Sequence, residues 1–389
     1  MVYRTIGLMS GSSLDGLDIA FAEFHENGGK WSYEILKADC YPYPKEWINR
    51  LKNATGLSSL EYQLLDADYG HYLGQQVNKF IEENELQYKV ALIASHGHTT
   101  FHVPAKKMTA QLGNGAAIAA ETQLPVVSDL RALDVALGGQ GAPIVPIGEK
   151  LLLGDYDYFL NLGGIANISV KPPFSKAEEG RGAEVVAFDI CPANRVLNML
   201  ANDAGKEYDK DGEMAAQGKV SKSLLDKLNA LDYYGQPYPK SLANDFGTDI
   251  VYPLIKETDI SINDALRTYI EHITAQISKS ITDLKNFQPV IARNEATTSN
   301  LSLRGTKQQL LATGGGAFNT FLVKELGAKL AELNIGVIVP DSKLVNFKEA
   351  LIMALIGVLR WREEYNVLPS VTGAKRSSVG GALWMGQES

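Results

Sequence analysis

Cysteine is almost missing from this sequence, which has two in 389 residues, Cys40 and Cys191. Two cysteines cannot build a disulfide framework in a chain of this length, so we expect a reducing compartment and a cytoplasmic protein. No apolar run reaches the roughly 18 residues that a membrane span requires, so we expect no membrane association. The first residues also lack the apolar segment of a signal peptide.

Dense clusters of lysine and arginine are lacking as well. The formal net charge is -8 and the sequence pI is ≈ 5.4, whereas proteins that bind nucleic acids usually carry a basic face. The sequence therefore predicts no nucleic-acid partner. Hydrophobic residues make up 45% of the chain and charged residues 21%. This composition is typical of a globular protein, and the length is sufficient for two domains.

Two similar successions of apolar segments follow each other along the chain. In each, three strands come first, and helices then alternate with two further strands. This order predicts an α/β fold with two domains and a ligand-binding cleft between them. The first succession has expected strands at 3–9, 17–24, 31–38, 90–94 and 124–128 and helices at 60–86 and 113–121. The second has strands at 158–162, 166–170, 185–188, 310–313 and 335–339 and helices at about 191–204, 221–231, 246–256, 263–285, 318–333 and 347–364.

The expected domain boundaries follow from these two successions. We expect an N-terminal domain formed by residues 1–130 together with 368–389, and a C-terminal domain formed by residues 131–367. Within the second, segment 288–309 is polar, unpatterned and free of aromatic residues. We interpret it as an inserted surface loop.

A glycine-flanked turn near the start of the chain carries the first functional signal. It reads Gly11-Ser12-Ser13-Leu14-Asp15-Gly16 and joins two apolar runs. Both glycines can adopt positive φ and let the backbone approach a ligand. Asp15 is suited to a phosphate only through a cation, and Mg²⁺ is the usual cation in nucleotide sites. The motif predicts a phosphate-binding turn, and an ordinary hairpin turn fits it about equally well.

Two more glycine turns lie in the second succession. Gly163-Gly164, with Asn167 after it, joins two apolar strands, and a tight hairpin is the alternative interpretation. Gly314-Gly315-Gly316, followed by Asn319, connects a buried strand to a helix whose N-terminus offers free N–H groups. Three such turns in this order predict a site for a phosphate chain. The arrangement resembles the actin, hexokinase and heat-shock ATPase superfamily, which has two phosphate turns and an adenosine turn.

Within that superfamily, the chain resembles the anhydro-N-acetylmuramic acid kinase family nearly from end to end. The resemblance implies a two-domain actin-like, ribonuclease H-like ATPase fold with an interdomain cleft. It also implies ATP and Mg²⁺ as cofactors, a small amino sugar as substrate, and a homodimer. The matching segments are Gly7–Gly16, Ser95–Thr99 with His102 and Pro104, Asp129–Arg131 with Asp134, Gly138–Pro143, Asn161–Asn167, Phe188–Asn194, Tyr208–Gly212, Pro239–Ser241, Gly314–Asn319, Lys348–Ala350 and Val371–Ala374.

The chemistry implied by the resemblance combines two steps. The family hydrolyses the 1,6-anhydro bond of the sugar and phosphorylates O6 with ATP, giving N-acetylmuramic acid 6-phosphate in cell-wall recycling. Asp189 matches the catalytic aspartate, the base that activates water. A carboxylate at a strand end in a closing cleft suits this role, because burial raises its pKa. From the residues alone, Asp189 is also a good N-cap for the helix that follows Pro192.

Binding residues are assigned by the same resemblance. Arg131 is expected to pair with the lactyl carboxylate of the sugar. Glu349 is also expected to hold the sugar, although it opens a predicted helix, where a carboxylate is favoured in any case. Asp15 is expected to bind Mg²⁺ through water. The full sugar-binding set is His96, Thr99, Arg131, Asn194 and Glu349, and the nucleotide-binding set is Gly11, Ser12, Ser13, Leu14, Asp15, Gly16, Gly163, Gly164, Asn167, Gly314, Gly315, Gly316 and Asn319.

Three departures from the family pattern bear on the substrate. His98 stands where the family commonly has glutamine, and Ile190 and Cys191 stand where it has threonine and glycine. After Pro239–Ser241, the arginine-bearing continuation is replaced by Leu242 and its neighbours. These changes keep open a kinase of the same fold that acts on a different sugar.

Two further alternatives remain. The first is a catalytically silent, nucleotide-dependent interaction protein, which the presence of Asp189, Arg131 and Glu349 disfavours. The second is a metal site formed by the closely spaced His96, His98 and His102, which is the weaker interpretation because the sequence offers no obvious further ligand.

Overall fold

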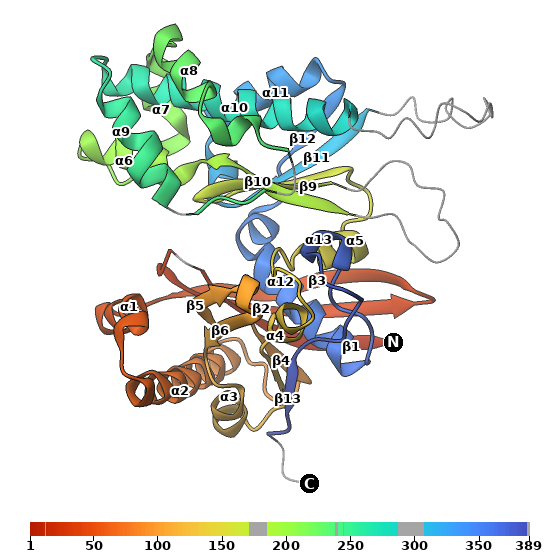
Figure 1. Ribbon diagram of the computed structural model, residues 1–389. Helices are drawn as coiled ribbons and strands as arrows, with labels where there is room; N and C mark the ends of the chain where they lie inside the picture. Colours follow the sequence, from red (N-terminus) through yellow and green to blue (C-terminus); the bar gives the residue numbers. More distant parts are fainter. Residues whose placement is uncertain (12, 171–184, 238–239, 244, 287–306, 387–389) are drawn as a thin grey trace, which may run out of the picture. The chain divides into compact units, whose positions relative to one another are not determined.

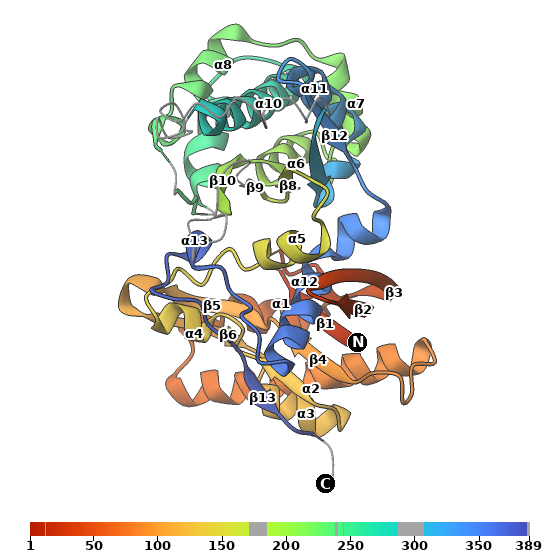
Figure 2. The same cartoon turned by 90° about the vertical axis from the view of Figure 1, so that its right-hand side faces the viewer.

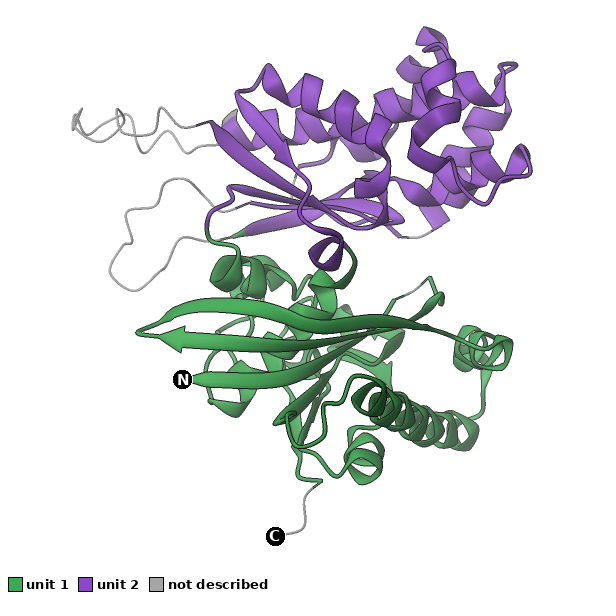
Figure 3. Ribbon diagram, turned by 180° about the vertical axis from the view of Figure 1, so that it is seen from behind, with its two compact units in different colours: residues 1–154, 175–185, 346–389 green, residues 155–174, 186–345 purple. Residues whose placement is uncertain are grey.

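The computed structural model describes every residue except 12, 171–184, 238–239, 244, 287–306 and 387–389. The chain divides into two compact units, drawn green and purple in Figure 3. The first unit contains the described residues of Met1–Gly154 and Asn346–Ser389 together with Val185, and the second contains those of Asp155–Phe174 and Val186–Val345. Each unit has its own sheet and helices (Figure 1), so the expected α/β class is confirmed.

The sheets of the two units share one strand order. In the first unit the order is β13-β7-β4-β1-β2-β3, and in the second it is β10-β9-β8-β11-β12. Each sheet therefore has an antiparallel meander of three consecutive strands, with two later strands added in parallel beside the first strand. The repeated order expected from the sequence is confirmed, and β13 is an addition at the edge of the first sheet.

The strand bounds agree closely with the expected ones. Those of the first unit are β1 Val2–Ser10, β2 Gly16–Asn27, β3 Lys30–Pro42, β4 Leu92–Ser95, β7 Val126–Ser128 and β13 Ala382–Trp384, with a separate hairpin of β5 His98–Val103 and β6 Met108–Leu112. Those of the second unit are β8 Tyr158–Leu162, β9 Ile165–Val170, β10 Val186–Pro192, β11 Gln308–Thr313 and β12 Ile335–Ile338. Since β11 begins at Gln308, the expected 288–309 loop ends earlier than predicted, and its residues 288–306 lie outside the described part of the chain.

The helices pack against these sheets within each unit. Those assigned to the first unit are α1 Lys45–Lys52, α2 Ser59–Glu83, α3 Gly115–Thr122, α4 Ala132–Ala136, α5 Pro146–Leu152 and α13 Pro369–Thr372, with most of α12 Ser342–Trp361. The second unit has α6 Asn194–Asp203, α7 Glu213–Gln217, α8 Lys222–Asn229, α9 Tyr252–Lys256, α10 Ile262–Asn286 and α11 Thr320–Ala331. A π-helix, η5 Phe246–Val251, continues directly into α9. The short 3-10 helices are η1 Ala54–Gly56, η2 Pro104–Lys106, η3 Lys210–Gly212, η4 Asp232–Gly235 and η7 Gly315–Phe318.

Helix α2 illustrates how the sequence specifies an element. Ser58 and Glu61 form a capping box at its start, in which each residue accepts a backbone N–H of the other. Its buried side chains recur every three or four residues, as an amphipathic helix requires. They belong to the core of the first unit and include Leu65, Tyr69, Leu73, Val77 and Phe80.

The units differ from the expected domains in where residues 131–154 and 346–367 belong. Both segments pack with the first unit, whereas we expected them in the C-terminal domain. Helix α12 explains the difference, because every residue from Ala350 to Leu359 is buried and must be covered on all sides. It reaches the first sheet closely enough that a Cβ at Gly7 would overlap the backbone of Ala350. Figure 2 shows α12 beside β1 and β4 of this sheet.

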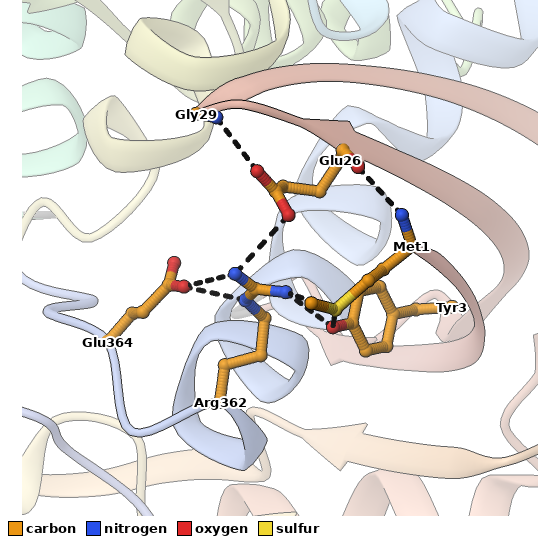
Figure 4. A network of polar contacts seen from close by, with 6 residues as sticks. All are labelled: Met1, Tyr3, Glu26, Gly29, Arg362 and Glu364. Atoms are coloured by element: carbon orange, nitrogen blue, oxygen red, sulfur yellow. Dashed lines mark hydrogen bonds and ion pairs between the residues drawn. The ribbon is translucent and has the colours of Figure 1, made fainter.

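The end of α12 is tied to the same sheet by charged groups. Arg362 forms ion pairs with Glu26 at 3.4 Å and with Glu364 at 2.5 Å, and its guanidinium also donates to the Tyr3 hydroxyl (Figure 4). The Met1 ammonium donates to the Glu26 carbonyl at 2.8 Å. The hydrogen bonds of Arg362 to Glu364 and, to a smaller extent, to Tyr3 raise its pKa. Together, these contacts fix the far end of α12 on β1 and β2.

No helix among the described residues is both long and apolar enough to cross a membrane.

Candidate functional site

The first glycine turn joins β1 to β2 and is organised by Asp15. The Asp15 carboxylate accepts the Ser13 hydroxyl at 2.7 Å and the Gly16 N–H at 3.0 Å, both through Oδ1. Ser12 lies outside the described residues. The expected positive φ falls on Leu14 (φ 57) and on neither flanking glycine. Position 16 requires glycine because the neighbouring strand β3 lies too close for a side chain. A Cβ at Gly16 would meet Cys40 Sγ at 2.6 Å.

A second carboxylate near this turn was missed from the sequence. Asp18 stands opposite Cys40 in the register of β2 and β3, and the Cys40 thiol donates to it. The pKa of Asp18 is raised to about 6, mainly by burial and to a smaller extent by the negative charges of Asp15 and Glu349. Asp18 lies two residues beyond the matched segment Gly7–Gly16, and its closeness to Asp15 in the sequence was a signal that it lies near the turn.

The residue before the turn is held by a chain of hydroxyl groups. The Tyr43 hydroxyl donates to Ser10 Oγ at 2.9 Å and shares a 2.6 Å hydrogen bond with Tyr69. Ser10 Oγ lies 3.2 Å from His98 Nδ1. His98, which departs from the family glutamine, is thus linked to the start of the first glycine turn. Burial lowers the pKa of His98, which favours the neutral imidazole.

His96 is used to hold Arg131. Its Nδ1–H donates to the Gly97 carbonyl at 2.8 Å, so its Nε2 accepts the Arg131 Nε–H at 2.8 Å. Burial and the Arg131 charge lower the pKa of His96 to about 3, so the imidazole is neutral. Arg131 also donates through Nη1 to the Gly141 carbonyl. Two edges of the guanidinium are therefore fixed, which presents the rest of it as a preorganised anion-binding group.

The loop around Gly141 is itself fixed by a buried carboxylate. Asp134 accepts the Gly141 N–H at 2.7 Å through one oxygen and the Thr372 hydroxyl at 2.7 Å through the other. Gln140 N–H donates to the Thr372 carbonyl at 2.7 Å. The matched segments Gly138–Pro143 and Val371–Ala374 are thus bound to each other within the first unit.

Glu349 and Thr99 complete the sugar-binding candidates of the first unit. Glu349 lies inside α12, two residues after a kink at Phe347 (φ -114), so it opens only the second half of the helix. Burial raises the pKa of Glu349, while the charges of Lys348 and Arg131 lower it. Thr99 is exposed on β5, where its hydroxyl accepts Gln111 Nε2–H at 3.3 Å. The first unit therefore brings Asp15, Asp18, Glu349, Arg131 and His96 into one charged neighbourhood.

The second glycine turn is supported from behind by the start of α6. The Gly164 carbonyl accepts the Ala193 N–H at 2.8 Å, and the Gly163 carbonyl accepts the Asn194 N–H at 3.1 Å. Asn194 also donates its side-chain amide to the Leu162 carbonyl at 2.8 Å. Both carbonyls of the turn therefore accept hydrogen bonds from the start of α6. We expect the N–H groups of the turn, on its opposite side, to be available to a ligand.

The third glycine turn lies against the second. A Cβ at Gly316 would meet Asn194 Oδ1 at 2.8 Å, so Asn194 bridges the two turns. Gly314 adopts positive φ (80), and a Cβ there would overlap Asn161. A short η7 turn separates the glycines from α11, which Asn319 caps by accepting the Leu322 N–H at 2.9 Å.

Asp189 stands in the middle of β10 and is held by backbone groups. Its Oδ2 accepts the Leu242 N–H at 2.9 Å, and its carbonyl accepts the Tyr233 hydroxyl at 2.7 Å. The N-cap position of α6 is Ala193, so the alternative that Asp189 caps this helix is wrong. Asn167 stands opposite Asp189 in the register of β9 and β10. Burial raises the pKa of Asp189, as a general base requires.

A β-bulge next to Asp189 accounts for two departures from the family pattern. The register of β10 shifts between Asp189 and Cys191, which leaves Ile190 as the additional residue. Ile190 is 1% exposed and Cys191 is fully buried, and both belong to the core of the second unit. These two side chains therefore fill the core beneath the strand.

The three closely spaced histidines each have a partner within the protein. Among the residues that the structure describes, no group of three or more histidine, cysteine, aspartate or glutamate side chains is arranged to hold a metal ion. His96 Nε2 accepts the Arg131 Nε–H, and His98 Nδ1 lies 3.2 Å from Ser10 Oγ. His102 Nδ1 lies 3.0 Å from the Thr109 hydroxyl.

Comparison with known proteins decides the family. The family model described as anhydro-N-acetylmuramic acid kinase matches residues 3–386. The chain belongs to the anhydro-N-acetylmuramic acid kinase family. Among the relatives, the anhydro-N-acetylmuramic acid kinase of Francisella tularensis subsp. novicida is 32% identical over 395 residues, with 97% of each chain covered. That of Sulfurovum sp. is 31% identical, with 98% of this chain and 99% of the relative covered.

Solved structures that resemble this family member are more distant. A ligand-bound xylulose kinase from Lactobacillus acidophilus has a TM-score of 0.42 and 10% identity, with 97% of this chain and 93% of that chain covered. The activator of 2-hydroxyisocaproyl-CoA dehydratase from Clostridium difficile, with bound ADPNP, has a TM-score of 0.39 and 15% identity, with 92% and 96% covered.

Proposed function

We propose that this chain is an ATP-dependent kinase that hydrolyses the 1,6-anhydro bond of anhydro-N-acetylmuramic acid and phosphorylates O6. The observation that carries the proposal is Asp189. It stands in the family motif with a raised pKa, and its Oδ2 accepts the Leu242 N–H, so it is a carboxylate suited to accept a proton from water. Family membership and two relatives of this name support the substrate. A catalytically silent protein or a different sugar is not favoured.

The proposed reaction consists of hydrolysis of the 1,6-anhydro bond and transfer of the γ-phosphoryl group of ATP to O6. Asp189 removes a proton from water as the water oxygen bonds to the anomeric carbon. The bond between that carbon and O6 breaks, and O6 attacks the γ-phosphorus of ATP. The bond to the β-phosphate oxygen breaks and ADP leaves. The products are N-acetylmuramic acid 6-phosphate, ADP and the proton that Asp189 passes to solvent.

Binding in this proposal is divided among named groups. The glycine turns donate backbone N–H groups to the phosphates of ATP, and Asn194, Thr99 and His96 support the sugar side. The fixed guanidinium of Arg131 pairs with the lactyl carboxylate. The exposed carboxylate of Asp15 suits Mg²⁺, which prefers oxygen ligands and keeps several waters, and the ion supplies charge neutralisation when bound.

The test is an assay of ADP release with 1,6-anhydro-N-acetylmuramic acid, ATP and Mg²⁺ in ¹⁸O-labelled water. We expect a 6-phosphate that carries ¹⁸O on the anomeric carbon. Asp189→Asn is the matched control, since asparagine keeps an oxygen for the Leu242 N–H but cannot take the proton. Its kcat should fall by roughly 10²–10⁴-fold while ATP binding remains. Binding of ATP without consumption of this sugar by the wild type would overturn the proposal.

Assembly and location complete the proposal. The resemblance supports a cytoplasmic homodimer. Light scattering on the purified protein tests the dimer, and a mass equal to one chain across concentrations would reject it. Fractionation of cells tests the location.

A further inference from the structure

A buried ion pair beside the sugar-binding candidates has no part in the proposed reaction. Lys348 Nζ lies 2.8 Å from Glu149 Oε1, and the two side chains are 4% and 5% exposed. Lys348 directly precedes Glu349 in α12 and follows the kink at Phe347. Glu149 lies on α5, which is in the same unit.

A buried ion pair contributes little to the free energy of unfolding. Removing a lysine and a carboxylate from water costs several kcal/mol for each ion, and apolar residues of similar volume often stabilise a protein equally well. The location adds to the cost, because a positive charge in the first turn of a helical segment opposes the helix dipole. A pair that persists under these conditions indicates a role beyond folding.

The pair is part of a close contact between α5 and α12. Ile352 follows Lys348 by one helical turn and lies on the same face. A Cβ at Gly148 would meet Ile352 Cγ1 at 2.5 Å. Gly148 and Glu149 thus face Ile352 and Lys348 in two adjacent contacts. The second half of α12 is thereby fixed in rotation as well as in position.

Glu349 is presented by this fixed helix. Across residues 348–359, all of which the structure describes, it is the one residue that is not buried. Burial raises its pKa, the charge of Lys348 lowers the pKa most among the charged neighbours, and that of Glu149 raises it. The charged groups that face Glu349 are Lys348, Arg131, Glu149 and Asp18.

We propose that the Glu149–Lys348 ion pair is a positioning element for Glu349, because it locks the turn of α12 that presents this carboxylate to its ligand. The identity of that ligand as a sugar rests on the proposed function, whereas the effect of the pair on Glu349 does not. The two members of the pair act on Glu349 with opposite sign. Loss of the Lys348 charge therefore disfavours the carboxylate, and loss of the Glu149 charge favours it.

The test measures the pKa of Glu349 directly in the full chain. Protein labelled with ¹³C at the glutamate carboxyl carbon is titrated by NMR, and Glu349→Gln identifies the resonance. We expect Lys348→Met to raise the pKa of Glu349 by about one unit and Glu149→Gln to lower it by a similar amount. The double variant should return close to the wild-type value. Ile352→Val is the matched control, because it alters the same contact without changing a charge.

Kinetics provide the second measurement. Lys348→Met should raise KM for the sugar about tenfold, more at low pH than at high pH, and leave KM for ATP unchanged. A pKa of Glu349 that equals the wild-type value, or moves in the same direction in both single variants, would overturn the proposal. If Lys348→Met does not fold, the pKa of Glu349 in Glu149→Gln and in the double variant without either charge still tests the proposal. Absence of sugar turnover would reject the proposed function alone, since the titration needs no substrate.

Discussion

The first and second glycine turns occupy equivalent places in two sheets of the same strand order, but they are built differently. The first is a longer loop whose shape depends on a carboxylate, Asp15, and on the hydroxyl of Ser13. The second consists of Gly163 and Gly164 alone, and the backbone of α6 holds it from behind. The repeated topology therefore places a glycine turn at the same point of each sheet. A carboxylate shapes the first turn, whereas contacts with the start of α6 hold the second.

The largest expected effect comes from removing the charge of the first turn. Asp15→Asn keeps an oxygen for Ser13 and for the Gly16 N–H, so the loop is retained. We expect kcat/KM for MgATP to fall by about 100-fold, because the proposed function assigns Asp15 to Mg²⁺ and the substitution removes its charge. Titration of activity with Mg²⁺ should show a higher requirement. An unchanged requirement would place the cation elsewhere.

The next largest effect is expected from Gly16→Ala, which tests a glycine required by packing. Its counterpart is Gly164→Ala, which tests a glycine proposed to contact the nucleotide. Gly16→Ala places a Cβ 2.6 Å from Cys40 Sγ and 2.8 Å from the Tyr41 carbonyl. Since the backbone of β3 cannot yield cheaply, we expect a loss of about 1–3 kcal/mol in the free energy of unfolding. Urea denaturation measures it. Gly29→Ala, whose Cβ would meet no atom within 4 Å, controls for loss of a glycine, although it carries its own strain at φ 81.

Gly164→Ala should show the opposite behaviour. The nearest atom to its Cβ is Arg195 Nε at 3.7 Å, an ordinary van der Waals distance. The fold should therefore keep its stability, while a methyl group at the turn hinders approach of a phosphate. We expect KM for ATP to rise about tenfold with unchanged urea midpoint. Equal ATP affinity in the variant would show that this turn does not contact the nucleotide.

The smallest effect is a pH dependence of stability at Asp18. Because its folded pKa is raised to about 6, the folded state binds a proton that the unfolded state has already lost. The wild type should lose stability relative to Asp18→Asn as pH rises from about 4 to about 6, and the difference should stay constant above that. Its size should be about 1 kcal/mol after allowance for partial exposure. A pH-independent difference would contradict the raised pKa.

Prediction from sequence succeeded where local pattern controls structure. The hydrophobic period of α2, the three strands of each meander and the glycine turns between strands were all recognisable, because each follows from residues close in sequence. The short hairpin of β5 and β6 was missed, since its strands lack a clear apolar alternation.

What the sequence could not reveal depends on contacts between distant segments. The Glu149–Lys348 pair joins residues 199 positions apart, and Lys348 alone reads as an ordinary surface lysine. Likewise, Ile190 and Cys191 read as changes beside the substrate until the β-bulge places them in the core. The membership of α12 in the first unit follows from its all-round burial, which a boundary drawn from element order cannot detect.

The contact at Gly7 has a mechanical consequence. The backbone of β1 touches that of α12 at Ala350, with no side chain between them that could yield. Three residues beyond Gly7, β1 ends at the first glycine turn, and one residue before Ala350 stands Glu349. The end of β1 and the α12 turn that carries Glu349 are therefore fixed to each other through this contact. Any side chain larger than glycine at position 7 would push the two apart, and a displacement of one has to displace the other.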